Sequence, residues 1–151
     1  MSMFIVRMGV LVLVSILLWL TVCSGRRFVE AQRQRALAAT PIISGNNNVD
    51  ANASWSLVRI LAFSSADCRQ CHELQIPALQ RVLDARGSKV SVAEVDAPNS
   101  NDLTQRFRVL TLPSTVVMDA AGRAHAVNYG FANTQRLLEQ VDEVLAQVSV
   151  S

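Results

Sequence analysis

The chain has 151 residues, 50% of them hydrophobic, and its formal net charge is +2 at pH 7. A chain of this length allows one ordinary domain together with additional segments. Most of the net positive charge comes from arginines between positions 26 and 35, and this small excess does not indicate a nucleic-acid-binding surface.

The first segment predicts a membrane-spanning helix. Residues 8–23 carry no charge. Extending this run back through residues 3–6, with Arg7 snorkelling to the interface, gives the roughly 20 residues that are needed to cross a bilayer. We therefore expect residues 1–25 to form a single transmembrane anchor that places the protein at the cell membrane.

Two alternatives for this segment remain open. A cleaved signal peptide needs small residues after the apolar run, and residues 21–25 fit that requirement poorly. Residues 20–23 resemble a lipoprotein signal in which Cys23 is acylated, although such signals usually have Gly, Ala or Ser where Val22 stands.

The arginines around this segment predict its orientation. Arg7 and the amino terminus precede the span, whereas four arginines follow it with only Glu30 opposing them: Arg26, Arg27, Arg33 and Arg35. The positive-inside rule counts the basic residues near the two ends of a span. It therefore favours a cytoplasmic position for the rest of the chain.

Residues 26–54 predict a connection between the anchor and a domain. Residues 26–39 are rich in Arg, Gln and Ala without proline, which indicates a helical stalk. Pro41 ends this pattern, and residues 44–54 are small, polar and turn-prone. We expect the latter to form a flexible tether.

Residues 55–151 predict one compact domain with a modest core. Its apolar runs alternate between strand-like and helical spacing, with Gly87 ending the first helix. The expected elements are a strand at 57–63, a helix at 68–85, a strand at 90–95, a short helix at 101–107, a hairpin of strands at 114–118 and 124–129, and a helix beginning near Asn133 or Thr134.

Residues 57–71 contain the candidate reactive site of the chain. A buried strand ends in a small polar break, and the motif Cys68-Arg69-Gln70-Cys71 follows at the start of a helix. Backbone N–H groups and the helix dipole favour a thiolate at that position. Arg69 also favours the thiolate of Cys68, whereas Asp67 disfavours it, so the net direction of its pKa shift is left open.

The order strand, helix, strand, helix, hairpin and helix, with a dithiol at the first helix and a proline before the hairpin, resembles the thioredoxin fold. The resemblance covers residues 56–148. It is carried by Phe63, the 68–71 motif, Val95-Asp96, the segment 111–115 and Gly122. It implies an α/β fold with a mixed central sheet of about four strands, flanked by helices.

The resemblance also implies a thiol–disulfide oxidoreductase whose redox-active disulfide is Cys68–Cys71, with no other cofactor and no metal. Cys68 is the expected nucleophile, and Cys71 is expected to resolve the mixed disulfide. Pro113 is expected to be cis beside the dithiol, and Leu112 to offer its backbone to an extended substrate segment. The expected partners are proteins with disulfides or dithiols and a redox donor. Relatives of this kind are commonly extracytoplasmic, which conflicts with the orientation given by the arginines.

Some residues depart from the family pattern. Ala62 occupies the position of the buried acid that assists proton transfer in thioredoxin, and Pro77 falls one residue later than the helix proline of that family. The proton acceptor for Cys71 is left open among His72, Glu73 and water.

Three other functions compete with this interpretation. In a non-catalytic binding module the dithiol would be vestigial. Residues 68–72 also match C-x-x-C-H, the c-type haem attachment pattern, with Met118 or His125 as the opposite ligand, but the surrounding strands argue against it. A zinc site formed by Cys68, Cys71, His72 and His125 is disfavoured because two ligands are adjacent in sequence.

Overall fold

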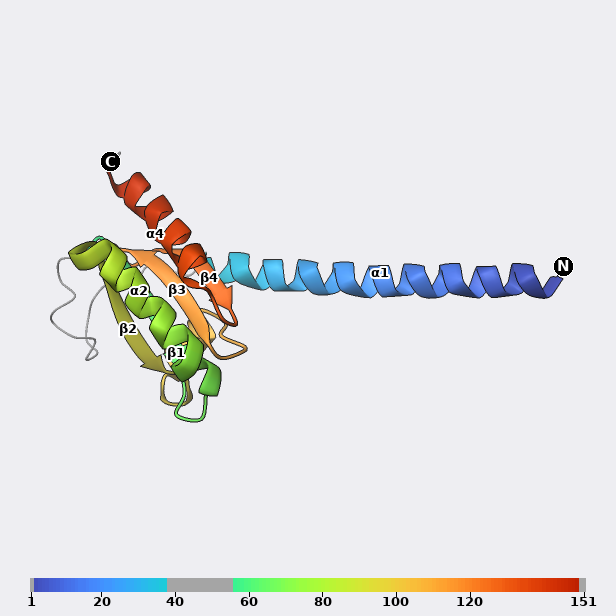
Figure 1. Ribbon diagram of the computed structural model, residues 1–151, viewed down its shortest axis with the longest axis horizontal. Helices are drawn as coiled ribbons and strands as arrows, with labels where there is room; N and C mark the ends of the chain where they lie inside the picture. Colours follow the sequence, from blue (N-terminus) through green and yellow to red (C-terminus); the bar gives the residue numbers. More distant parts are fainter. Residues whose placement is uncertain (1, 38–55, 150–151) are drawn as a thin grey trace. The chain divides into compact units, whose positions relative to one another are not determined.

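The computed structural model describes residues 2–37 and 56–149 (Figure 1). The chain divides into two compact units, Met1–Gln34 and Arg35–Ser151. Most of helix α1 (Ser2–Leu37) belongs to the first unit, and the sheet with its helices belongs to the second. The predicted tether at 44–54 lies outside the described residues.

Helix α1 corrects the prediction of a membrane anchor. The helix is long, but in the part of the chain that the structure describes no helix is both long and apolar enough to cross a membrane. The predicted transmembrane helix at 1–25, and with it the single-pass location in the cell membrane, is therefore wrong. The uncharged run lies between Arg7 and Arg26, and the prediction reached about 20 residues only by extending past Arg7.

The second unit contains a mixed sheet of four strands in the order β2-β1-β3-β4. The strands are β1 (Val58–Ser64), β2 (Val90–Asp96), β3 (Ser114–Asp119) and β4 (Ala124–Tyr129). Strand β1 is parallel to β2 and antiparallel to β3, and β3 and β4 form a hairpin. This arrangement confirms the predicted α/β class and the mixed sheet of about four strands.

Each face of the sheet has its own hydrophobic core. Helices α2 (Ile76–Arg86) and α4 (Thr134–Val148) lie side by side over one face (Figure 1). Their side chains pack on alternate residues of β1 and β3, and the central members are Ile60, Ala62, Leu79, Val82, Val117, Leu137, Val141 and Val144. On the other face Phe63 packs against Phe107, which follows helix α3 (Asn101–Arg106), with 6.3 Å between their ring centroids.

The helix that follows β1 is less regular than the sequence predicted. Residues Cys71–Gln75 form a π-helical turn, in which the N–H of Ile76 bonds to the carbonyl of Cys71, and only then does α2 continue. Pro77 explains the irregularity, because it has no N–H and its ring conflicts with the carbonyl of Glu73 four residues earlier. Gly87 ends α2 as predicted, with φ of +55°.

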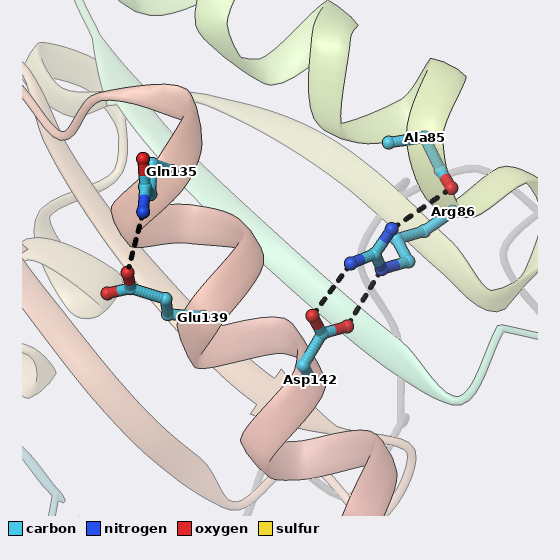
Figure 2. Close-up of polar contacts among 5 residues, drawn as sticks. All are labelled: Ala85, Arg86, Gln135, Glu139 and Asp142. Atoms are coloured by element: carbon cyan, nitrogen blue, oxygen red, sulfur yellow. Dashed lines mark hydrogen bonds and ion pairs between the residues drawn. The ribbon is translucent and has the colours of Figure 1, made fainter.

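An ion pair on the surface connects the C-terminal end of α2 to α4 (Figure 2). The Nε and Nη2 atoms of Arg86 donate to the two carboxylate oxygens of Asp142 at 2.8 and 2.7 Å. The hydrogen bond from Arg86 holds the pKa of Asp142 below its usual value. The bidentate geometry makes this contact between the two helices specific, but solvent screens a pair that is this exposed.

A polar network is buried between α4 and the hairpin. The side-chain amides of Asn128 and Gln140 bond reciprocally, at 2.8 and 2.9 Å, and Asn128 also donates to the hydroxyl of Thr115 at 3.0 Å. Arg136 donates to the remaining side of the Asn128 oxygen at 3.2 Å. Because an unsatisfied buried amide is costly, this network specifies how α4 docks on β4.

We predict that Gln140→Leu lowers the free energy of unfolding of the full chain by about 1–3 kcal/mol, because it leaves the Asn128 amide without its reciprocal partner. Urea denaturation followed by circular dichroism measures the change. Gln147→Leu, the same substitution at an exposed position of α4, is the control and should change it by less than about 0.5 kcal/mol. Equal effects of the two substitutions would contradict the role of the network.

The second prediction concerns Asp119, which closes the β3–β4 turn. Burial raises the pKa of Asp119, but hydrogen bonds from the Arg123 N–H, from His125 and from the Arg123 guanidinium outweigh burial and leave the pKa lowered. Because the folded-state pKa is lowered, the ionised carboxylate stabilises the fold at pH values above the unfolded-state pKa near 3.8. This stabilisation is lost as the pH falls through the folded-state pKa. The stability difference between the parent and Asp119→Asn should therefore be largest near neutral pH and shrink below about pH 4. Denaturation midpoints across this pH range test it, and a difference independent of pH would contradict it.

Candidate functional site

The candidate site lies at one end of the sheet, where three segments meet. Ser114 at the start of β3 pairs with Phe63 near the end of β1 and with Tyr129 at the end of β4. The loop to the dithiol leaves β1 at this end, Pro113 enters β3 here, and the chain leaves β4 here toward α4. The sheet register therefore brings together segments that are distant in the sequence.

The two cysteines are joined in a disulfide, with 5.3 Å between their Cα atoms. The N–H of Cys71 donates to the carbonyl of Cys68 at 3.0 Å and contacts its Sγ atom at 3.2 Å. Cys71 is 1% exposed, whereas Cys68 is partly exposed. Cys68 is thus the more accessible of the two residues, and its sulfur receives a backbone N–H, which favours a thiolate, whereas Cys71 is shielded.

Both charged neighbours of Cys68 point into solvent. Asp67 and Arg69 are exposed, and the Nε of Arg69 pairs with Glu73 one helical turn later at 2.7 Å. Solvent screens charges in such positions, and the glutamate offsets part of the arginine's charge. The proposed tuning of the Cys68 pKa by these two residues stays a prediction.

Gln75 holds the turn that carries Cys71, and sequence reasoning missed it. Its side chain is 3% exposed; it donates to the carbonyl of Ala132 at 3.2 Å and accepts from the Ala132 N–H at 3.0 Å. This reciprocal pair ties the π-helical turn to the loop between β4 and α4. A signal was present, since Gln75 stands between Cys71 and Leu79 at the spacing of the buried helix face.

The peptide bond between Leu112 and Pro113 is cis, the isomer expected from the resemblance. Pro113 is buried, and its carbonyl accepts from the N–H of Gly130 at 2.9 Å. Gly130 has φ of +87°, a conformation that glycine adopts without strain. Phe131, which follows it, is 44% exposed. Leu112 is half-buried, and its predicted contact with substrate stays a prediction.

A cavity of about 110 Å³ lies behind the dithiol, between α2 and the strands β1 and β2. Cys71, Ala62 and Gln75 line it, together with Glu94 from β2. Ala62 and Glu94 are register partners in the parallel pair. Sequence reasoning missed Glu94, because only the register of the two strands places it beside Ala62.

The residues required by the haem and zinc alternatives are spread over the domain. His72 is exposed beside the dithiol, whereas His125 bonds to Asp119 at the opposite end of β3 from Pro113. Over residues 2–37 and 56–149, no group of three or more His, Cys, Asp or Glu side chains is placed to hold a metal ion. The geometry therefore gives these two alternatives no support.

The structure is similar to solved structures of thioredoxins. Chloroplastic thioredoxin z is 27% identical, and the match covers 64% of this chain and 85% of that chain with a TM-score of 0.54. Thioredoxin-2 of the malaria parasite is 20% identical, covering 69% and 93% with a TM-score of 0.55. A mutant thioredoxin from Halobacterium salinarum is also 20% identical, covering 66% and 85% with a TM-score of 0.55. The sequence itself matches no protein-family model and no curated protein.

We predict that the two thiols of the reduced protein differ in reactivity, because Cys68 is partly exposed and Cys71 is buried. Iodoacetamide should modify Cys68 at least about tenfold faster than Cys71 near neutral pH. Peptide mass spectrometry separates these two sites from Cys23. In urea the two rates should converge, and faster modification of Cys71 in the folded protein would contradict the assignment.

Proposed function

We propose that this chain, which is thioredoxin-like in its fold and in its C-x-x-C disulfide, is a thiol–disulfide oxidoreductase that acts on partner proteins. The observation that carries the proposal is the asymmetry of the Cys68–Cys71 pair. A disulfide between a partly exposed and a buried cysteine at the start of a helix suits a nucleophile and a resolving thiol.

The proposed reaction has two steps. In the dithiol form, the thiolate of Cys68 attacks a disulfide of the partner, so that a bond forms between Cys68 and one partner sulfur while the other partner sulfur leaves as a thiolate. Cys71 then attacks the Sγ of Cys68, which restores the Cys68–Cys71 disulfide and releases the second partner thiol. Two electrons pass to the partner, and a thiol donor must return them.

The backbone beside the dithiol supports a mode of substrate binding. An extended partner segment would pair with the backbone of Leu112 as an added strand, since this residue precedes cis Pro113 at the site end of β3. Phe131 would contact an apolar side chain of that segment, since its ring is 44% exposed and Gly130 is bonded to Pro113. We propose Leu112 and Phe131 as the substrate-contacting residues.

We expect the full chain to catalyse reduction of insulin disulfides by dithiothreitol, and Cys68→Ser and Cys71→Ser to abolish the catalysed rate. Cys23→Ser is the matched control and should keep full activity, because Cys23 lies on α1 and outside the dithiol. Equilibration of the protein with glutathione, read by thiol alkylation, should show a two-electron couple. The reduction potential of this couple would show whether the protein resembles reductants, near about −270 mV, or oxidants, near about −120 mV. Absence of a couple that depends on Cys68 would overturn the proposal and favour the non-catalytic binding module.

A further inference from the structure

The second step of the proposed reaction requires a proton acceptor near Cys71. Cys71 is 1% exposed and lies against the apolar core. Burial in such surroundings disfavours a thiolate, yet only the thiolate attacks a disulfide. A base must therefore be within hydrogen-bonding distance of Cys71, directly or through one water. Ala62, on the strand behind it, offers no such group.

The cavity behind the dithiol is lined both by Cys71 and by a residue with a carboxylate. Its volume is about 110 Å³, which is room for a few water molecules at about 30 Å³ each. Cys71, Gln75 and Glu94 all line it. The amide and the carboxylate supply polar partners for such water.

The sheet fixes the direction of Glu94. Residues paired in register on neighbouring strands project from the same face of a sheet, so Glu94 shares the α2 face with its partner Ala62. Because β2 is an edge strand, the carboxylate reaches solvent while it borders the cavity. The hydroxyl of Ser64, which is 9% exposed, donates to Oε1 of Glu94 at 3.1 Å.

No other charged group among the described residues lines this cavity. The residues that β1 contributes are uncharged, those of the helix other than Cys71 are aliphatic or carry amides, and Val92 is the other contributor from β2. His72 and Glu73, which follow Cys71 in sequence, are exposed and are not part of the lining. Cys71 and Glu94 are therefore the two titratable residues that line the cavity.

We infer that Glu94 is the proton acceptor for Cys71, acting through water in the cavity; this inference rests on the proposed oxidoreductase function. The proton of the Cys71 thiol passes through water to the Glu94 carboxylate. The Cys71 thiolate attacks Cys68, the Cys68–Cys71 bond forms, and the bond from Cys68 to the partner breaks. When a donor thiol later reduces the disulfide, Glu94 returns the proton to the departing Cys71 thiolate. Ser64 is a positioning residue that orients the carboxylate.

The test separates the two chemical steps. The reduced full chain, carrying Cys23→Ser to remove the third thiol, is mixed with excess dithiobis(nitrobenzoate). Attack by Cys68 releases a first coloured thiolate, and resolution by Cys71 releases a second. Glu94→Gln should slow the second release by about a hundredfold, the lower end of the range for a positioned general base. The first release should stay within about twofold.

Matched variants control for effects of the substitution that do not involve the proton acceptor. Glu143→Gln, the same substitution at an exposed position of α4, should leave both releases unchanged. Ser64→Ala keeps the carboxylate but removes its hydrogen bond, so it should slow only the second release, and by less than Glu94→Gln; it serves as the test should Glu94→Gln not fold. An unaltered second release in these variants, or slowing in Glu73→Gln instead, would overturn the inference while the proposed function stands. Absence of a first release that depends on Cys68 would instead overturn the proposed function.

Discussion

The pairing of β1 with both of its neighbours is the constraint on which the rest of the domain depends. β1 is buried on both faces, so it contributes to both cores. Its parallel register with β2 sets Glu94 opposite Ala62, and its antiparallel register with β3 brings Pro113 to the end where the dithiol loop begins. A shift of one residue in either pairing would turn the side chains of that strand to the opposite face. The chemistry of the site is thus determined by hydrogen bonds between strands rather than by the C-x-x-C motif alone.

Two buried side-chain amides connect further segments of the domain. Gln75 joins the turn of Cys71 to Ala132, and Gln140 joins α4 to Asn128 on β4. In each case a side-chain amide satisfies both a donor and an acceptor, as a backbone strand pair would. The loop between β4 and α4, which carries Phe131, is therefore held by hydrogen bonds at Ala132 and lies between β4 and α4, which are themselves joined by Asn128 and Gln140.

Local patterns in the sequence predicted the elements of the domain well. Alternating and helical spacing located all four strands, α3, the end of α2 and the start of α4 within a residue or two. The buried strands, α2 and α4 could be located because they bury apolar side chains. The resemblance supplied the cis bond at Pro113. The sequence did not reveal the π-helical turn before Pro77, the partner of Gln75 or the place of Glu94. These depend on contacts between residues far apart in the chain, or on a local conflict that periodicity does not report. The membrane anchor was predicted from an apolar run extended past Arg7, and no helix among the described residues is long and apolar enough to cross a membrane.

The closeness of the two cysteines has a consequence for how partners would distinguish the oxidised from the reduced protein. They are three residues apart within one hydrogen-bonded turn, and Cys71 already bonds to the Cys68 carbonyl. Gain or loss of the cross-link closes or opens a ring confined to that turn, so the sheet and both cores can keep the same shape in each state. A partner that selects one state would therefore have to distinguish the two states by its contacts at the partly exposed Cys68.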